Sequence, residues 1–208
     1  MLMERQSKKE AWVTIISESI ATKLSKRENL DHLEYLKIKL GLEVLLINLM
    51  KGSVVYGISI ITGTFWPTFI THLSYFSLRR TAFGLHAKSS FVCSITSILL
   101  FNLIPVMLQG VEVNNLVLFL LSPLLVWLIY LYAPADTEKN PLTNATLRNK
   151  LRKQSVNTTI LLLVIALLIP YPMPSVMIVL GVCWQVVSIL PATYKLLGRS
   201  YNNHEKFR

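Results

Sequence analysis

The stretch LVLFLLSPLLVWLIYLYA, residues 116–133, decides the fold class of this chain. It carries no charged side chain, and an α-helix of this length rises about 27 Å, close to the ~30 Å hydrocarbon core of a bilayer. The same pattern recurs on both sides of it. Further runs with almost no charge cover residues 53–78, 91–110, 156–169 and 175–193, and residues 40–50 form another apolar stretch.

The composition of the whole chain agrees with this pattern. Only 15% of the 208 residues are charged and 52% are hydrophobic, whereas about a quarter of the residues of a globular protein are charged. The sequence therefore predicts an all-α, polytopic integral membrane protein with about six transmembrane helices. The first crossing is expected near residues 40–62, and a turn at 63–67 leads into a short second crossing that ends at Arg79. The other four are expected near residues 91–110, 116–132, 156–170 and 175–193.

The positions of the basic residues predict the topology. The net charge is +10, and eight of the 21 Lys and Arg residues precede residue 40. The others cluster at residues 79–88, 139–153 and 195–208, apart from Lys51, whereas residues 110–115 and 171–174 contain none. With six crossings, every basic cluster falls on one side, so the positive-inside rule predicts that both termini are cytoplasmic. The charge thus indicates topology and attraction to anionic lipids, and no nucleic-acid partner is predicted.

We expect a single membrane domain over residues 1–208. Residues 1–39 form cytoplasmic or interfacial helices, residues 40–194 the transmembrane helices with a cytoplasmic loop at 133–155, and residues 195–208 a cytoplasmic tail. Apolar side chains recur every three to four residues within 11–28, which predicts an amphipathic helix at the membrane surface. Asn29 is the expected N-cap of the next helix.

A histidine and a cysteine share the polar break between the second and third apolar runs. This break reads RRTAFGLHAKSSFVC from Arg79 to Cys93 and contains His86. Histidine is the usual base that deprotonates a nucleophilic cysteine at neutral pH. In a straight helix, residues seven apart lie about 10.5 Å apart along the axis, too far for proton transfer. The pair can react only if residues 84–90 depart from a straight helix, which Gly84 permits. The alternative is an interfacial histidine and a small buried thiol.

The same stretch resembles the signature of the AgrB family, Arg-Arg…Gly-x-His-Ala…Cys. The resemblance extends to NLDHLEYLKIKLGLEVL at 29–45, APADT at 133–137 and ILPATYK at 189–195. AgrB proteins are endopeptidases of the bacterial cytoplasmic membrane that process the AgrD quorum-sensing pro-peptide. The resemblance implies that His86 and Cys93 are the catalytic pair. It also implies an AgrD-like pro-peptide at the inner leaflet as partner, which is cleaved and cyclised to a thiolactone or lactone.

Other polar residues are candidates for supporting roles. Glu43 lies in the apolar entry to the first crossing, where placing a carboxylate costs free energy. It could orient His86 or hydrogen-bond the tetrahedral intermediate, or simply pair with Lys39. Arg79, Arg80 and Gly84 are candidate substrate-binding residues, although the two arginines could equally anchor the second crossing at the membrane surface.

The remaining reactive side chains are assigned structural roles. Asp136 is interpreted as a turn residue, His72 as a partner between helices, Cys183 as a packing residue, and Lys51 as an interfacial cation. The sequence predicts neither a cofactor nor a metal ion, because two distant thiols do not form a zinc site. Two rival functions stay open: a small-solute or peptide transporter, and a non-catalytic scaffold. We also expect a homodimer, since the short crossings and polar helix faces leave surface for a partner.

Overall fold

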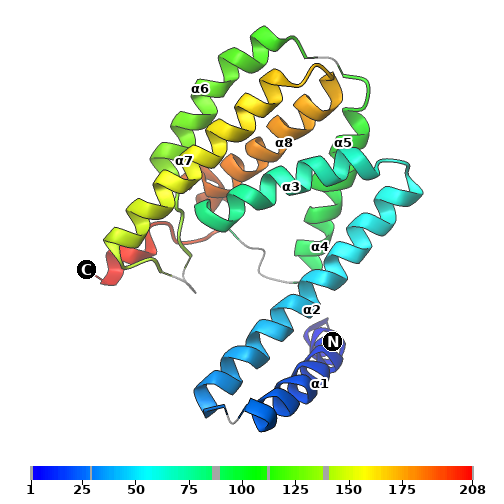
Figure 1. Cartoon of the computed structure of the whole chain (residues 1–208), viewed down its shortest axis with the longest axis vertical. Coiled ribbons are helices and arrows are strands. Elements are labelled where there is room, and N and C mark those ends of the chain that lie inside the picture. Colours follow the sequence, from blue (N-terminus) through cyan, green and yellow to red (C-terminus); the bar gives the residue numbers. More distant parts are fainter. Residues whose placement is uncertain (1, 29, 86–89, 112, 138–140, 208) are drawn as a thin grey trace. The chain divides into compact units, whose positions relative to one another are not determined.

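The computed structural model describes residues 2–28, 30–85, 90–111, 113–137 and 141–207, with no side-chain description for 2–11, 90–91 and 206–207. The chain divides into two compact units, Met1–Gly57 and Ile58–Arg208, and each is described by itself. Long helices dominate both (Figure 1). Outside the helices, an isolated parallel bridge joins Phe83 to Ala135. The predicted all-α membrane fold is confirmed.

The first unit contains the predicted amphipathic helix. Helix α1 runs from Leu2 to Glu28 and helix α2 from His32 to Ile61, of which residues 32–57 belong to this unit. The face of α1 that carries Val13, Ser17 and Ala21 is buried, whereas an adjacent apolar row stays exposed. That row consists of Trp12, Ile16, Ile20 and Leu24. An uncovered apolar row on a helix with charged residues elsewhere suits the membrane interface.

The start of α2 differs from the expectation that Asn29 caps it. Asn29 lies outside the described residues, and α2 begins only at His32. The Asp31 carboxylate accepts a hydrogen bond from the His32 amide at 2.6 Å, and the Glu34 carboxylate accepts one from the Asp31 amide at 3.3 Å. These reciprocal bonds satisfy amide groups that a helix start leaves without carbonyl partners. Asp31 therefore occupies the capping position.

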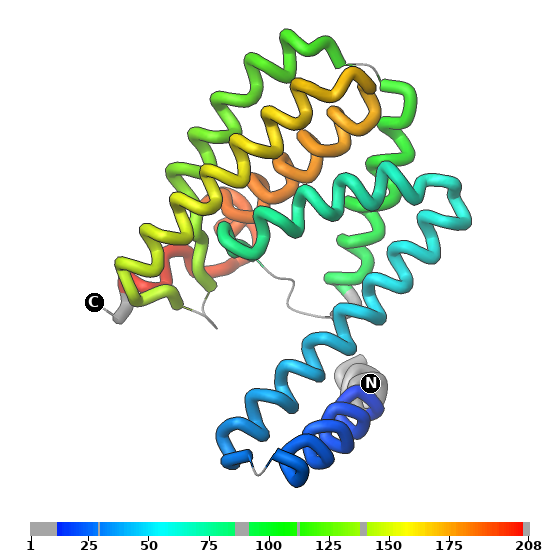
Figure 2. The backbone as a smooth tube through the Cα atoms, in the orientation of Figure 1, coloured from blue at the N-terminus to red at the C-terminus, as the bar shows by residue number. Residues whose placement is uncertain are grey.

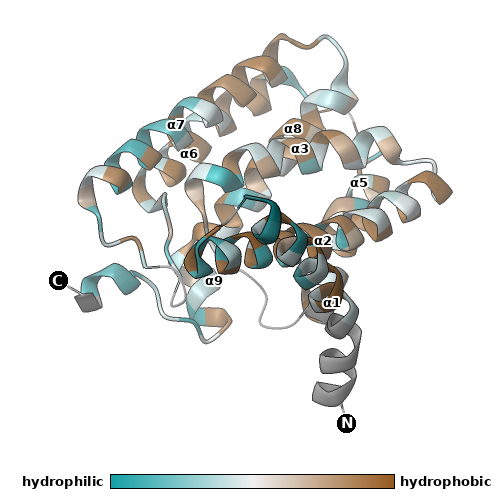
Figure 3. Ribbon diagram, turned by 60° about the horizontal axis from the view of Figure 1, so that its bottom comes forward, coloured by the Kyte–Doolittle hydropathy of each residue, from teal (hydrophilic) through white to brown (hydrophobic). Residues whose placement is uncertain are grey.

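Four long helices form the core of the second unit (Figure 2). They are α3 (Phe65–Ala82), α6 (Asn115–Tyr132), α7 (Ala145–Leu168) and α8 (Pro172–Ile189). Helix α8 contacts the other three and contributes more buried residues than any of them. Asn144 caps α7, so the basic segment after it and the fifth apolar run form one continuous helix. Figure 3 shows the change along α7 from hydrophilic to hydrophobic.

Shorter helices complete the second unit. Helix α4 (Ser90–Ile98) continues through a π-helical turn, η1 (Leu99–Leu103), into α5 (Ile104–Met107), and this segment packs on α3. After α8, the chain forms α9 (Pro191–Leu196) and a final 3₁₀ helix, η2 (Asn203–Phe207). The π-helical turn directly precedes Pro105, whose missing amide and ring disturb a regular helix.

Four of the described helices are long and apolar enough to cross a membrane: α2, α6, α7 and α8. The segment Val92–Met107 is a shorter apolar helix. The second expected crossing corresponds to α3, which contains the polar residues Thr68, Thr71 and Ser74 on its buried side. Thus the membrane class is clear, and the number of six crossings stays a prediction.

Helix α8 packs closely on α3 at Gly181. A Cβ atom added there would lie 2.6 Å from the Thr71 carbonyl oxygen and 2.8 Å from the Ser74 Cβ atom. Small residues at helix contacts allow backbones to approach in this way, which is common in membrane proteins. Because α3 ends at the polar break and α8 lies beside it, this contact fixes the frame of the candidate site.

We predict that Gly181→Ala destabilises the protein by about 1–3 kcal/mol, the usual range for overpacking. Unfolding in detergent micelles, followed by circular dichroism, measures the effect. Gly52→Ala in α2 is the control, because no atom lies within 4 Å of the added Cβ position and alanine favours helix. Equal stability of the two variants would contradict the close packing of α3 on α8.

Candidate functional site

Cys93 lies in the first turn of α4 and is half-buried. Amide groups at a helix start carry partial positive charge, which favours a thiolate over a thiol. The Tyr75 ring of α3 lies 5.2 Å from that of Phe101 and 5.9 Å from the Arg79 guanidinium carbon. Tyr75 therefore packs between the end of α3 and the π-helical turn that continues α4.

His86 lies outside the described residues, as does Lys88. The described chain ends at Leu85 and resumes at Ser90, the first residue of α4. The expectation that residues 84–90 are not a straight helix agrees with the part that is described, because α3 ends at Ala82. The pairing of His86 with Cys93 stays a prediction.

The Arg79 guanidinium binds the chain's own backbone just before His86. Its Nη1 donates to the Phe83 carbonyl at 2.9 Å and to the Ser188 hydroxyl at 3.3 Å. Its Nη2 donates to the Gly84 carbonyl at 3.0 Å and to the Leu85 carbonyl. A planar, always charged fork suits several acceptors at once. Arg79 thus holds the backbone of residues 83–85 in place.

Two other segments, the end of α8 and the segment after α6, hold the same backbone. The Gln185 side chain donates to the Phe83 carbonyl at 2.7 Å, and the Leu85 amide donates to the Ser188 carbonyl at 3.0 Å. The Gly84 amide donates to the Ala135 carbonyl at 2.9 Å. Figure 2 shows the meeting of the ends of α3 and α8 with the segment after α6. Residues 83–85 are therefore fixed from both sides.

Gly84 is the residue type that this arrangement requires. Its φ angle is +111°, and a Cβ atom would lie 2.8 Å from Arg79 Nη1, 2.8 Å from the Ser188 hydroxyl and 2.9 Å from the Ser188 carbonyl. Phe83 before it has φ of +54°, which is rare outside glycine. Such strained backbone persists only where the surroundings determine it, and it is frequent at functional sites.

The prediction from the sequence did not include Gln185 and Ser188, although one signal pointed to them. Both lie within the apolar run 175–193, where a polar side chain usually has a partner inside the protein. Gln185 is fully buried. Nothing in the sequence connects it with Phe83, which lies 102 residues away.

Arg79 and Gly84 lie together, whereas Arg80 is exposed. Of the two arginines proposed to bind substrate, only Arg80 faces outward, and Arg79 binds carbonyl groups of its own chain. A contact of either with a substrate stays a prediction.

Glu43 belongs to the first unit, where Ser17 donates a hydrogen bond to its carboxylate at 3.4 Å. The alternative interpretation pairs Glu43 with Lys39, but Lys39 forms its ion pair with a different carboxylate. Lys39 binds Glu18 of α1 at 3.2 Å. Both contacts join α1 to α2. Lys51 of the same helix is half-buried.

The residues assigned structural roles lie as follows. Cys183 packs against the hydrophobic core, as expected. His72 contacts the Phe101 ring at 4.8 Å between centroids. Asp136 is more than a turn residue, because its buried carboxylate accepts hydrogen bonds from the C-terminal segment. No local feature of the sequence indicated that contact.

Comparison with known proteins identifies relatives along most of the chain. The sequence model of the family Accessory gene regulator B matches residues 17–189. An AgrB-like protein of Listeria innocua is 44% identical over 177 residues, covering 85% of this chain and 87% of the relative. Accessory gene regulator protein B of Staphylococcus epidermidis is 39% identical over 189 residues, covering 90% of this chain and 95% of the relative. No solved structure matches significantly.

We predict that Arg79→Lys lowers the free energy of unfolding by at least about 2 kcal/mol, because an ammonium cannot serve the separate carbonyls of residues 83–85 and leaves some unpaired. Arg80→Lys, at the neighbouring exposed position, should change it by less than about 0.5 kcal/mol. Denaturant unfolding of both variants in the same detergent gives the comparison. A loss for Arg80→Lys as large as that for Arg79→Lys would contradict the anchoring role.

Proposed function

Because this chain belongs to the AgrB family, whose members act in the agr quorum-sensing system, we propose that it is a membrane-embedded cysteine endopeptidase. Its substrate is an AgrD-like pro-peptide at the inner leaflet of the bacterial cytoplasmic membrane, and the enzyme removes the C-terminal part of that peptide. Cys93 is the nucleophile and His86 is the base.

The reaction follows from the chemistry of these two groups. His86 takes the proton of the Cys93 thiol, and the thiolate attacks a backbone carbonyl of the precursor. The peptide bond breaks, His86 returns the proton to the leaving amine, and the N-terminal part stays bound to Cys93 as a thioester. A substrate cysteine or serine then attacks the thioester, which forms the thiolactone or lactone ring and releases Cys93. A site that limits water access favours this transfer over hydrolysis.

One observation carries the proposal: the backbone just before His86 is fixed. Four hydrogen bonds from Arg79 and Gln185 reach the carbonyls of residues 83–85. Cys93 follows in the first turn of the next helix. A base must lie within hydrogen-bond distance of its thiol, and displacement by about 1 Å can cost about 100-fold in rate. Holding residues 83–85 in place supports accurate placement of the base relative to the thiol.

We predict that Cys93→Ala and His86→Ala each abolish precursor cleavage, whereas Cys183→Ala leaves it nearly intact. The precursor is co-expressed with each variant, and the peptide products are measured by mass spectrometry. Cys183 is the matched control, because it is the other thiol of the chain and packs against the core. Normal cleavage by Cys93→Ala protein at normal membrane levels would refute the cysteine mechanism.

We further propose that Glu43 supports the reaction by accepting or donating a hydrogen bond at the site. A carboxylate in an apolar helix is expensive unless it has a function or a partner. The contact with Ser17, at 3.4 Å, is long for a bond from a hydroxyl group. This contact therefore offsets little of the free-energy cost of placing the half-buried Glu43 carboxylate in an apolar helix.

This role predicts that Glu43→Gln retains much of the cleavage activity and that Glu43→Ala loses most of it. Ser17→Ala is the control, since it removes the observed contact and leaves Glu43 unchanged. Initial cleavage rates in membranes with equal enzyme levels compare the three. If Ser17→Ala lowers the rate as much as Glu43→Ala, then the residue acts only by joining α1 to α2.

The surroundings of the site support the rest of the proposal. Arg80 and the basic first turns of α7 belong to the side that the positive-inside rule assigns to the cytoplasm. The same rule assigns both termini to that side, and the basic groups attract anionic lipids and an acidic substrate segment. Exposed apolar residues of the helices face lipid or a second copy of the chain in a homodimer.

A further inference from the structure

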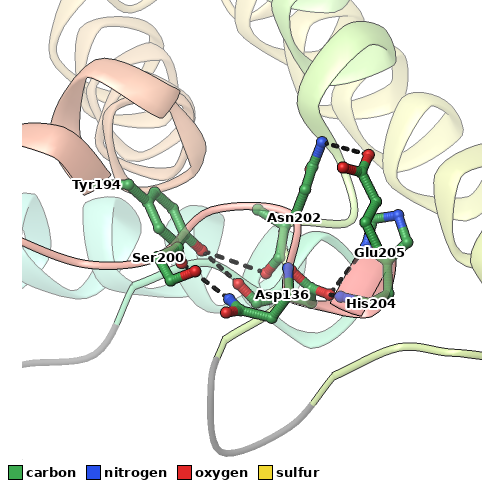
Figure 4. A network of polar contacts seen from close by, with 8 residues as sticks. Asp136, Tyr194, Ser200, Asn202, His204 and Glu205 are labelled. Atoms are coloured by element: carbon green, nitrogen blue, oxygen red, sulfur yellow. Dashed lines mark hydrogen bonds and ion pairs between the residues drawn. The ribbon is translucent and has the colours of Figure 1, made fainter. Parts of the chain in front are cut away.

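Asp136 is a buried carboxylate that the proposed reaction does not use. It lies in the segment after α6, and it is only 4% exposed. Its oxygens accept hydrogen bonds from the Asn203 amide at 2.9 Å, the His204 amide at 2.7 Å and the His204 ring Nδ1 at 2.9 Å (Figure 4). We call this arrangement of Asp136, Asn203 and His204 the tail clasp.

The Asp136 carboxylate needs the donors of the tail clasp, because burying a charged carboxylate without hydrogen-bond partners is unfavourable. Taking a charge out of water costs several kcal/mol unless donors replace the lost water. The clasp supplies three donors, from residues 67 and 68 positions further along the chain. Asn203 and His204 are themselves buried, at 2% and 7% exposure.

The backbone of the same segment is also fixed from the C-terminal side. The Tyr194 hydroxyl donates to the Asp136 carbonyl at 2.9 Å, and its ring contacts that of Tyr201 at 5.1 Å. Burial raises the pKa of Tyr201, so its phenol stays neutral at physiological pH. In addition, the Asn203 side chain donates to the Ser200 carbonyl at 2.8 Å. The tail is thus ordered around Asp136.

The residue before Asp136 connects the clasp to the candidate site. The Ala135 amide donates to the Ala82 carbonyl at 3.0 Å, and its carbonyl accepts from the Gly84 amide at 2.9 Å. Ala135 is 2% exposed, so water does not compete for these bonds. Gly84 precedes His86 by two residues. A shift of Asp136 therefore moves the backbone of residues 82–84, which precede His86 in the chain.

We propose that Asp136 is a positioning residue, which acts through the backbone of residues 82–84 on the candidate catalytic residue His86 that follows them in the chain. Through Asn203 and His204, the tail clasp holds residues 133–136 against residues 82–84, and this contact sets the backbone that leads to His86. The inference rests on the proposed function, because it assumes that His86 activates Cys93. It assigns the C-terminal segment, far from Cys93 in sequence, a role in the rate of the reaction.

The test measures the reactivity of the Cys93 thiol with iodoacetamide, which requires no peptide substrate. All variants carry Cys183→Ala, so that Cys93 is the only thiol of the chain. Full-length protein in liposomes is alkylated over a range of pH. The variants are His86→Ala, Asp136→Ala, Asp136→Asn and Glu205→Ala. Glu205 is the matched control, because it lies on the same tail and its exposed side chain binds Asn202 instead of Asp136.

We expect Asp136→Ala to slow alkylation at neutral pH about 10-fold or more and to move the half-maximal rate to higher pH, the same direction that we expect for His86→Ala. Asp136→Asn keeps one acceptor oxygen and should give an intermediate shift. This variant provides the test if the alanine variant does not fold. Glu205→Ala should match the parent protein. A purely structural role would reduce the yield of folded protein without changing the pH profile of the folded fraction.

The positioning role is refuted if both Asp136 variants keep the profile of the parent while His86→Ala shifts it. Failure of the proposed function gives another pattern, in which His86→Ala itself has the profile of the parent, and the positioning role then fails with it. With precursor as substrate, Asp136→Ala should lower kcat about 10- to 100-fold and change KM less than about threefold. A change confined to KM would also refute it.

Discussion

The hydrogen bonds from the Arg79 guanidinium to the carbonyls of residues 83–85 hold the backbone around which the rest of the candidate site is arranged. Helix α3 ends at Ala82, and the carbonyls of the partly or fully buried residues that follow it, including the strained Phe83, need donors. A single rigid cation supplies several of them. Its own charge is neutralised by no carboxylate among the described contacts, so carbonyl dipoles and the Tyr75 ring stabilise it.

This arrangement makes separate parts of the chain depend on one another. Helix α8 supplies Gln185 and Ser188, and it reaches α3 closely because residue 181 is glycine. The segment after α6 supplies Ala135, which the C-terminal segment holds through Asp136. The loop that leads to His86 is consequently supported by residues from four places in the sequence. Such support is what a reaction between two side chains on separate elements needs.

Much of the fold could be predicted from local sequence. Runs such as residues 116–133 carry an apolar signal that does not depend on distant residues, and the helices lie where the runs are. Gly84 also permits a break in the helix, and α3 does end at Ala82. The inward direction of Arg79 could not be predicted, because Arg79 and Arg80 are neighbours and only packing against α8 distinguishes them. Likewise, Asp136 looked like a turn residue, since its partners are 67 and 68 residues away.

The covalent intermediate on Cys93 tests the central claim most directly. Enzyme in liposomes is mixed with an AgrD-like precursor, quenched in acid within the first turnover, digested and analysed by mass spectrometry. The account predicts that the peptide containing Cys93 gains the mass of the N-terminal part of the precursor through a thioester that hydroxylamine removes. Cleavage of the precursor with no adduct on Cys93 at any time, and with the same rate in Cys93→Ala protein, would contradict it.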